Sequence, residues 1–179
     1  MEERIDEAFA GKQLLTVVGK QLRVGDLAPD FCLDYLDLAD LVVRTISLAD
    51  SVGLVRLLSV VNSLERRVCQ RMTHRWEALC SDVPAHACIY TVSRDSPQMQ
   101  AHWQETQGVL HQVLSAQHSE RFAQDYGVWL KQWRQLQRAV LVLDRNDRIA
   151  YAEYVADQLR EPDYAAALQA VQQAAMEGH

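Results

Sequence analysis

Cys69 is the residue of this chain whose position best suits it to chemistry. An apolar run over residues 54–61 ends in a short polar loop, and a helix-like run from Cys69 to about Cys80 follows. The first turn of a helix leaves backbone N–H groups without partners and forms the positive end of the helix dipole. Such a position, with Arg66 and Arg67 nearby, favours the nucleophilic thiolate. The alternative is a buried structural cysteine.

The remaining cysteines are poor partners for a disulfide with Cys69. Cys80 follows it by eleven residues, which is roughly 16 Å along a helix axis, whereas a disulfide needs Cα atoms within about 7 Å. Cys32 and Cys88 fall in apolar, strand-like runs and are expected to be small core residues. No Cys-x-x-Cys pattern is present, which argues against a dithiol oxidoreductase. We expect all four cysteines to be thiols at rest.

The sequence predicts neither a metal site nor a cofactor. Cys69 and His74 are close in sequence, but no further ligand cluster accompanies them. No glycine-rich phosphate loop is present. Four other histidines are scattered and expected on the surface: His86, His102, His111 and His118. Trp129 and Trp133 are spaced by four, so they would share one face of a helix.

Composition places the chain among ordinary globular proteins. It has 179 residues, 49% hydrophobic and 23% charged, and we expect a single domain over 1–179. The net charge of −6 argues against a nucleic-acid partner, which would call for a basic field. No apolar run is long enough to cross a bilayer, so no membrane association is expected. The acidic N-terminus does not resemble a signal peptide, and a cytoplasmic location is expected.

Strand and helix patterns alternate along the chain, which predicts an α/β fold around a mixed sheet. Residues 8–24 are rich in β-formers broken at Gly11 and Gly19, which predicts an N-terminal hairpin. Ser96 and Pro97 are typical of a helix start, here leading to about Gln107. The apolar residues of segment 109–122 show neither a clear helical nor a clear strand periodicity. The other expected strands are 31–36, 41–46, 54–61, 87–92, 138–143 and 149–155, and the other helices are 69–80 and 163–176.

Several separated motifs resemble one family in the same order. The opening resembles that of bacterial thiol peroxidases, which are atypical two-cysteine members of the peroxiredoxin family; the residues concerned are Val18-Gly19-Lys20-Gln21-Leu22, Val24-Gly25-Asp26 and Ala28-Pro29-Asp30-Phe31. Similar matches follow at Leu58-Ser59-Val60-Val61, Ser63-Leu64, Val68-Cys69, Thr73-x-Arg75, Arg138-Ala139-Val140, Val142-Leu143-Asp144, Tyr154-Val155 and Glu161-Pro162-Asp163-Tyr164. The resemblance implies a thioredoxin-like fold with a central mixed sheet flanked by helices and an N-terminal β-hairpin.

The active-site pattern of that family is only partly present. The family pattern is Pro-x-x-x-Thr-x-x-Cys together with a distant Arg. The Cys of this pattern falls on Cys69, and the Arg falls on Arg138. Asn62 stands at the Pro position and Arg66 at the Thr position, so both are candidate substrate-pocket residues. The family's second, resolving cysteine would follow a Trp, and here Gln104 follows Trp103.

The resemblance implies a peroxidase that reduces hydrogen peroxide or a small organic hydroperoxide. Cys69 would be the nucleophile and Arg138 its electrostatic partner. Without a resolving cysteine, an external thiol such as a thioredoxin would reduce Cys69, and the family implies a homodimer. The alternative is a catalytically impaired redoxin-fold protein that serves as a thiol sensor or binding module. Asn62, Arg66 and Gln104 favour that alternative.

Overall fold

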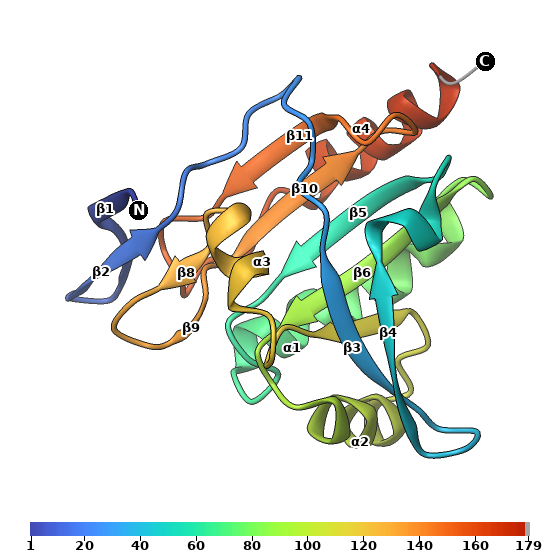
Figure 1. Cartoon of the computed structure of the whole chain (residues 1–179), viewed down its shortest axis with the longest axis horizontal. Coiled ribbons are helices and arrows are strands. Elements are labelled where there is room, and N and C mark those ends of the chain that lie inside the picture. Colours follow the sequence, from blue (N-terminus) through green and yellow to red (C-terminus); the bar gives the residue numbers. More distant parts are fainter. Residues whose placement is uncertain (178–179) are drawn as a thin grey trace.

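A seven-stranded mixed sheet forms the centre of the molecule (Figure 1). The computed structural model describes residues 1–177. The strand order is β11-β10-β5-β6-β7-β3-β4, and β5, β6 and β7 run parallel while the other neighbours are antiparallel. The predicted α/β fold with a central mixed sheet is confirmed. The strands are β3 (Cys32–Asp37), β4 (Val42–Ser47), β5 (Val55–Val60), β6 (Ala87–Ser93), β7 (Gln112–Ser115), β10 (Ala139–Leu143) and β11 (Ile149–Tyr154).

Helices cover both faces of this sheet because its central strands are apolar on both sides. Every residue of β5 is buried, including Arg56, whose guanidinium pairs with the Asp147 carboxylate at the strand's end. Helices α1 (Arg67–Leu79) and α4 (Tyr164–Met176) pack on one face. Helix α3 (Glu120–Asp125) lies on the other, and α2 (Pro97–Gln107) lies against β3 and β7. Two short 3₁₀ turns complete the set, η1 (Leu48–Ser51) and η2 (Cys80–Asp82).

Local capping explains where the predicted helices begin. The Ser96 hydroxyl accepts a hydrogen bond from the Met99 N–H at 3.1 Å, and Pro97 occupies the first helical position of α2. Asp163 caps α4 in the same way through the Ala166 N–H. These caps confirm both predicted starts, because each side chain satisfies an N–H that the helix leaves unpaired.

A smaller sheet packs beside the first and contains the N-terminal hairpin. Its order is β1-β2-β8-β9, with β1 (Glu3–Ala10), β2 (Gln13–Val18), β8 (Trp129–Leu130) and β9 (Gln135–Leu136). The predicted hairpin is present, but it begins at Glu3 rather than Ala8. The charged segment 3–7 is a strand with one buried face, on which Arg4 and Ala8 lie.

Gly127 allows the chain around the small sheet to pack closely. Its φ is +65°, and a Cβ there would lie 2.3 Å from the backbone oxygen of Lys20. Only glycine combines that conformation with that approach. This close approach allows β2 of the hairpin to pair with β8, where Val17 lies opposite Leu130.

Three expectations about individual side chains are wrong. Trp129 and Trp133 do not share a helical face: Trp129 lies in β8 and Trp133 in the following turn, because β8 is recruited as the partner of β2. Cys32 is exposed rather than in the core, since strand side chains alternate and the neighbouring Leu33 takes the buried side. His111 is only 5% exposed, because its ring turns inward just before β7.

Other sequence expectations are resolved by the structure. The aperiodic segment 109–122 contains β7 and the start of α3, two elements too short to show a period. Three of the four scattered histidines are exposed as expected: His86, His102 and His118. Among residues 1–177, no helix is both long and apolar enough to cross a membrane.

Candidate active site

Cys69 lies in the first turn of α1, as predicted. Arg66 is the N-cap residue and Cys69 is the third residue of the helix. Its side chain is fully buried in an apolar cluster with Leu64, Met72 and Trp103. The position therefore combines the positive end of a helix dipole with exclusion of water, and the latter strengthens any electrostatic contact made there.

Arg138 reaches Cys69 because strands β5 and β10 are neighbours. Ala139 pairs with Val60, so the residue before β10 lies beside the loop that follows β5. The Nη2 atom of Arg138 is 3.1 Å from the Sγ atom of Cys69. The Nε–H donates to the Met72 sulfur at 2.8 Å, and Nη1 donates to the backbone oxygen of Gln158. The structure thus brings together the two residues that the sequence pattern singled out.

The charge of Arg138 has no carboxylate partner in the described part of the chain. Arg138 is fully buried, and no Asp or Glu within residues 1–177 forms an ion pair with it. A guanidinium remains charged in proteins, and a buried charge is strongly unfavourable unless it is paired. The group positioned to supply the missing negative charge is the Cys69 sulfur as thiolate.

Asn62 contacts both members of this pair and is almost fully buried. Its Nδ2 donates to the Leu136 carbonyl at 2.6 Å and to the Gln158 side chain at 3.0 Å, which fixes the amide's orientation. Its Oδ1 then accepts from Arg138 at 3.1 Å and lies 3.8 Å from the Cys69 sulfur. The sulfur is therefore approached by a hydrogen-bond donor from Arg138 and by an acceptor from Asn62.

Arg66 does not enter the space around the sulfur. The centre of its guanidinium lies 3.9 Å from the centre of the Trp133 ring, which is a cation–π contact with the turn between β8 and β9. Within the described part of the chain, its side chain makes no hydrogen bond to Cys69, Asn62 or Arg138. The position therefore provides neither the hydroxyl of the family pattern nor a replacement donor at the sulfur.

Sequence reasoning missed Gln158, which holds Asn62 and Arg138 in place. Its Oε1 accepts from the Arg138 backbone N–H at 2.9 Å as well as from Asn62, and its Nε2 donates to the Val155 carbonyl at 2.7 Å. It lies in the loop after β11 and is 2% exposed. A single glutamine in a loop carries no local signal, so only the fold reveals this role.

Asp95 was also missed, and it fastens the loop that leads into α1. Its carboxylate accepts from the Ser63 hydroxyl at 2.7 Å, the Leu64 N–H at 2.8 Å and the Ser93 hydroxyl at 2.7 Å. Asp95 follows β6, and Ser63 follows the parallel neighbour β5. The sequence from Ser93 to Pro97 is typical of a helix start. This local pattern does not indicate that Asp95 also binds the neighbouring loop.

Gln104 takes a structural position where a resolving cysteine would lie. Its Nε2 donates to the carbonyls of Val109 at 3.3 Å and His111 at 2.9 Å, which closes the end of α2. The four cysteines are all free thiols. Cys80 is the C-cap of α1, at the opposite end of the helix from Cys69, so these two sulfurs are far beyond disulfide distance.

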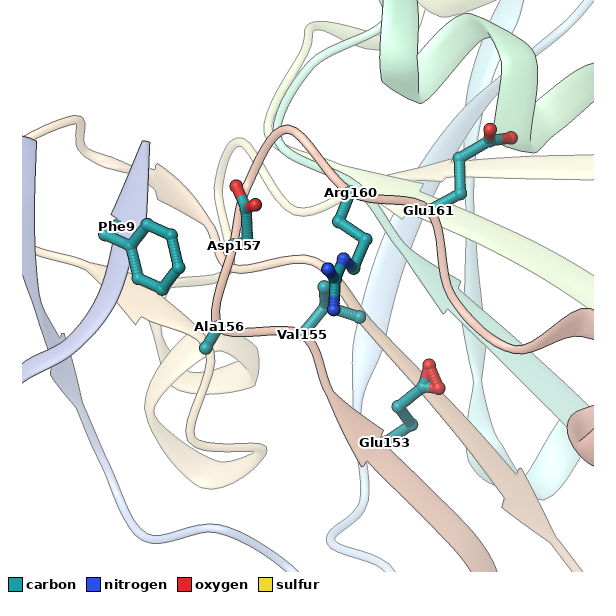
Figure 2. Close-up of a pocket in the computed structure, with 7 residues that line it drawn as sticks. All are labelled: Phe9, Glu153, Val155, Ala156, Asp157, Arg160 and Glu161. Carbon is teal, nitrogen blue, oxygen red and sulfur yellow. The ribbon is translucent and has the colours of Figure 1, made fainter. Parts of the chain in front are cut away.

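A surface hollow beside the loop after β11 does not include the Cys69 sulfur. It has a volume of about 440 Å³ and lies between the small sheet and the loop after β11 (Figure 2). Arg160 reaches toward Val155 in its middle, and Phe9 stands at one side. None of Cys69, Asn62 and Arg138 lines it. Access to the fully buried sulfur therefore requires local opening of the loops around it.

Comparison with known sequences gives a consistent result over most of the chain. Residues 24–152 match the model of the AhpC/TSA family. A thiol peroxidase from Streptococcus sanguinis is 40% identical over 158 residues, which cover 88% of this chain and 93% of that protein. A thiol peroxidase from Bacillus subtilis is 36% identical over 151 residues, which cover 84% of this chain and 87% of the relative.

Solved structures show the same architecture. A peroxiredoxin-like protein from Aquifex aeolicus superposes with a TM-score of 0.82 at 24% identity, covering 95% of this chain and 98% of the other. A thiol peroxidase from Chromobacterium violaceum gives a TM-score of 0.78 at 20% identity, covering 95% and 97%. At these identities the likeness concerns the fold, and it confirms the expected thioredoxin-like arrangement.

Proposed function

The chain belongs to the AhpC/TSA family of peroxiredoxins and is a thiol-dependent peroxide reductase, and we propose that Cys69 is its nucleophile and Arg138 the electrostatic partner. The observation that carries this assignment is the buried Arg138 guanidinium, which has no carboxylate partner among residues 1–177 and lies 3.1 Å from the Cys69 sulfur. Cys69 is also the only one of the four cysteines that lies in the first turn of an α-helix.

The reaction begins with attack of the Cys69 thiolate on one oxygen of the peroxide. The O–O bond breaks, the sulfur becomes a sulfenic acid, and the other oxygen departs with the electron pair and takes a proton to become water or an alcohol. Arg138 stabilises the thiolate before the step. Its Nη2–H also lies where it can donate to the developing negative charge on the leaving oxygen.

We propose that the cycle closes through an external thiol, in a one-cysteine mode. An incoming thiol condenses with the sulfenic acid, releasing water and forming a mixed disulfide, and a second thiol then releases Cys69. Gln104 at the resolver position and the placement of Cys80 at the far end of α1 support this mode. A thioredoxin is the proposed reductant, and hydrogen peroxide or a small organic hydroperoxide the proposed substrate.

Cellular context and assembly are part of the same proposal. We propose that residues 1–179 act as one domain in the cytoplasm and pair as a homodimer, as the family resemblance implies. Sedimentation velocity of the reduced protein tests the assembly. A monomer at the highest accessible concentration would contradict the dimer without affecting the assignment of Cys69.

Stopped-flow measurement of Cys69 oxidation tests the catalytic assignment. Trp103 shares the buried cluster of Cys69, so tryptophan emission is a suitable signal. The unmodified protein should react with one equivalent of peroxide, and Cys69→Ser should not react. Cys32→Ser and Cys88→Ser serve as matched controls and should keep the wild-type rate.

The fate of the oxidised sulfur tests the one-cysteine mode. Mass spectrometry of mildly oxidised, folded protein should find sulfenic acid or a mixed disulfide on Cys69. A disulfide from Cys69 to another cysteine of the same chain would contradict the mode but leave the nucleophile assigned. Stoichiometric oxidation with very slow turnover under every thiol reductant would favour the thiol-sensor alternative.

A further inference from the structure

Three side chains of metal-ligand type meet where the end of α1 faces the loop before β7. They are Glu77 and Cys80 from the helix and His111 from the loop, and their ligand atoms all lie within 4.8 Å of one another. Glu77 Oε2 is 2.9 Å from His111 Nδ1 and 3.9 Å from Cys80 Sγ. The mechanism above uses none of the three. We propose that Glu77, Cys80 and His111 form a binding site for a single thiophilic divalent cation of the Zn²⁺ class.

The scaffold of this cluster is fixed by backbone contacts. Glu77 accepts hydrogen bonds from the Leu110 N–H at 2.5 Å and the His111 N–H at 3.2 Å. Gln104 binds the His111 carbonyl from the other side at 2.9 Å. The loop that presents the imidazole is therefore held against the helix that presents the other two groups, and a cation would meet ligands already close together.

The Nε2 atom of His111, which faces away from Glu77, has the hydrogen-bond partner that a metal-binding histidine usually has. His111 Nε2 lies 2.8 Å from the Thr91 hydroxyl, which belongs to β6 and is fully buried. When Nδ1 binds a cation, Nε2 carries the ring proton and donates it to Thr91. Histidine ligands usually make such a second contact, which fixes the ring's tautomer and angle.

The donor set identifies the class of cation. Thiolate, imidazole and carboxylate are the three side-chain ligand types that Zn²⁺ takes in proteins, and a water molecule would complete a tetrahedral site here. Ca²⁺ and Mg²⁺ prefer oxygen ligands alone, so a cysteine and a histidine disfavour them. Ligand distances of about 2.0–2.3 Å place the ligand atoms of such a site roughly 3.3–3.8 Å apart. Small side-chain movements here would satisfy that geometry, and the thiol proton would be released to solvent.

The site is separate from Cys69 and does not rest on the peroxidase assignment. Residues 69 and 80 are at opposite ends of α1, roughly 16 Å apart along the axis. A bound cation would fasten the end of the helix that carries the nucleophile to the α2–β7 loop. It would also occupy the Cys80 thiol and keep it out of thiol exchange.

Titration of the reduced, chelator-treated full chain with Co²⁺ tests the proposal. One Co²⁺ per chain should bind, giving a sulfur-to-cobalt charge-transfer band and the visible bands of a four-coordinate ion, and Zn²⁺ should displace it. Cys80→Ser should abolish the charge-transfer band, whereas Cys69→Ser and Cys88→Ser should keep it. Thr91→Val should weaken Co²⁺ binding about 10- to 100-fold, the usual effect of removing a hydrogen-bond partner of a metal-binding histidine.

Two results would overturn the proposal. One is the absence of a saturable charge-transfer band; the other is a band that survives Cys80→Ser and disappears in Cys69→Ser, which would place the ion at the other thiol. Alkylation of the unmodified chain provides a test that needs no substitution, so it does not depend on whether a variant folds. Stoichiometric Zn²⁺ should protect Cys80 from iodoacetamide while leaving the exposed Cys32 reactive, and equal labelling of Cys80 with and without Zn²⁺ would contradict the site.

Discussion

At the scale of single residues, opposing contacts at the Cys69 sulfur define the site. Arg138 offers a positive charge at 3.1 Å, and Asn62 offers an acceptor oxygen at 3.8 Å. A charge in a water-free environment acts more strongly than a neutral amide dipole at a longer distance. We therefore expect a nucleophilic Cys69 whose reactivity Asn62 moderates.

Arg138→Met should greatly slow the oxidation of Cys69. The variant removes the charge that stabilises the thiolate and the donor closest to the leaving oxygen. Loss of one preorganised donor typically costs about 100- to 1,000-fold in rate. Stopped-flow fluorescence with excess peroxide measures the effect, and Arg121→Met, at a side chain 89% exposed, is the control. A rate within a few-fold of wild type would remove Arg138 from the mechanism.

Asn62→Pro combined with Arg66→Thr should accelerate the oxidation of Cys69. The change removes the acceptor that faces the Cys69 sulfur and supplies a hydroxyl that both donates and accepts hydrogen bonds. We expect a gain of at least about 10-fold, a fraction of what one preorganised group contributes. Arg67→Thr, at an exposed neighbouring position, controls for loss of positive charge. If the double variant gains nothing, the missing proline and threonine do not limit the rate.

At the scale of elements, the site exists because two loops meet at the carboxyl ends of parallel strands. The loop after β5 leads into α1 and carries Asn62, while the loop after β6 carries Asp95. Two hydrogen bonds to the Asp95 carboxylate, from the Ser63 hydroxyl and the Leu64 N–H, join these two loops. The first turn of α1, and with it Cys69, is thereby positioned by a residue that does not touch the sulfur.

Asp95→Asn should loosen this connection. The amide keeps the size of the carboxylate but loses its charge, and one of its two terminal atoms no longer accepts a hydrogen bond. We expect the free energy of unfolding to fall by about 1.5–3 kcal/mol, the usual range for a hydrogen bond to a charged group. Urea titration measures it, with Glu65→Gln, exposed on the same loop, as control. Equal stability of the two variants would show that Asp95 does not hold the loop.

At the scale of the whole molecule, buried tyrosines join segments far apart in sequence. The Tyr154 hydroxyl accepts from the Leu22 N–H at 3.0 Å and donates to the Tyr126 carbonyl at 2.7 Å. Burial raises the pKa of Tyr90, Tyr151 and Tyr154 to about 12. The pKa of Tyr126 is also raised, mainly by burial.

These shifts predict loss of stability in alkali. A group whose pKa is higher in the folded state contributes stability that is complete below its unfolded pKa, about 10 for tyrosine, and is lost as the pH rises through the folded value. The free energy of unfolding should therefore fall between about pH 10 and 12. Tyr154→Phe should lower stability at neutral pH but make the alkaline decline shallower. Urea titrations across this range measure both slopes, and parallel curves would contradict the prediction.

Most elements of the main sheet and the helices were predictable from local sequence, because each depends on its own periodicity and caps. Strand β5 is a continuous apolar run, and Ser96 and Asp163 mark the starts of α2 and α4. The errors have a common physical cause. Residues 129–130 form a strand because β2 offers them an unpaired edge, and the His111 side chain is buried because Thr91 and Glu77 form contacts with its ring. Such partners come from distant parts of the chain.

The sequence by itself determined that Cys69 begins a helix after a buried strand, since that follows from local patterns of apolar residues. It also paired Cys69 with Arg138 through a family resemblance. Only the tertiary structure decided what surrounds the sulfur. Gln158 and Asp95 hold the site through hydrogen bonds across 20 to 32 residues, and Arg66 turns away onto Trp133. The direction of each side chain depends on which strands become neighbours. The order of the strands is set by hydrophobic burial across the whole chain.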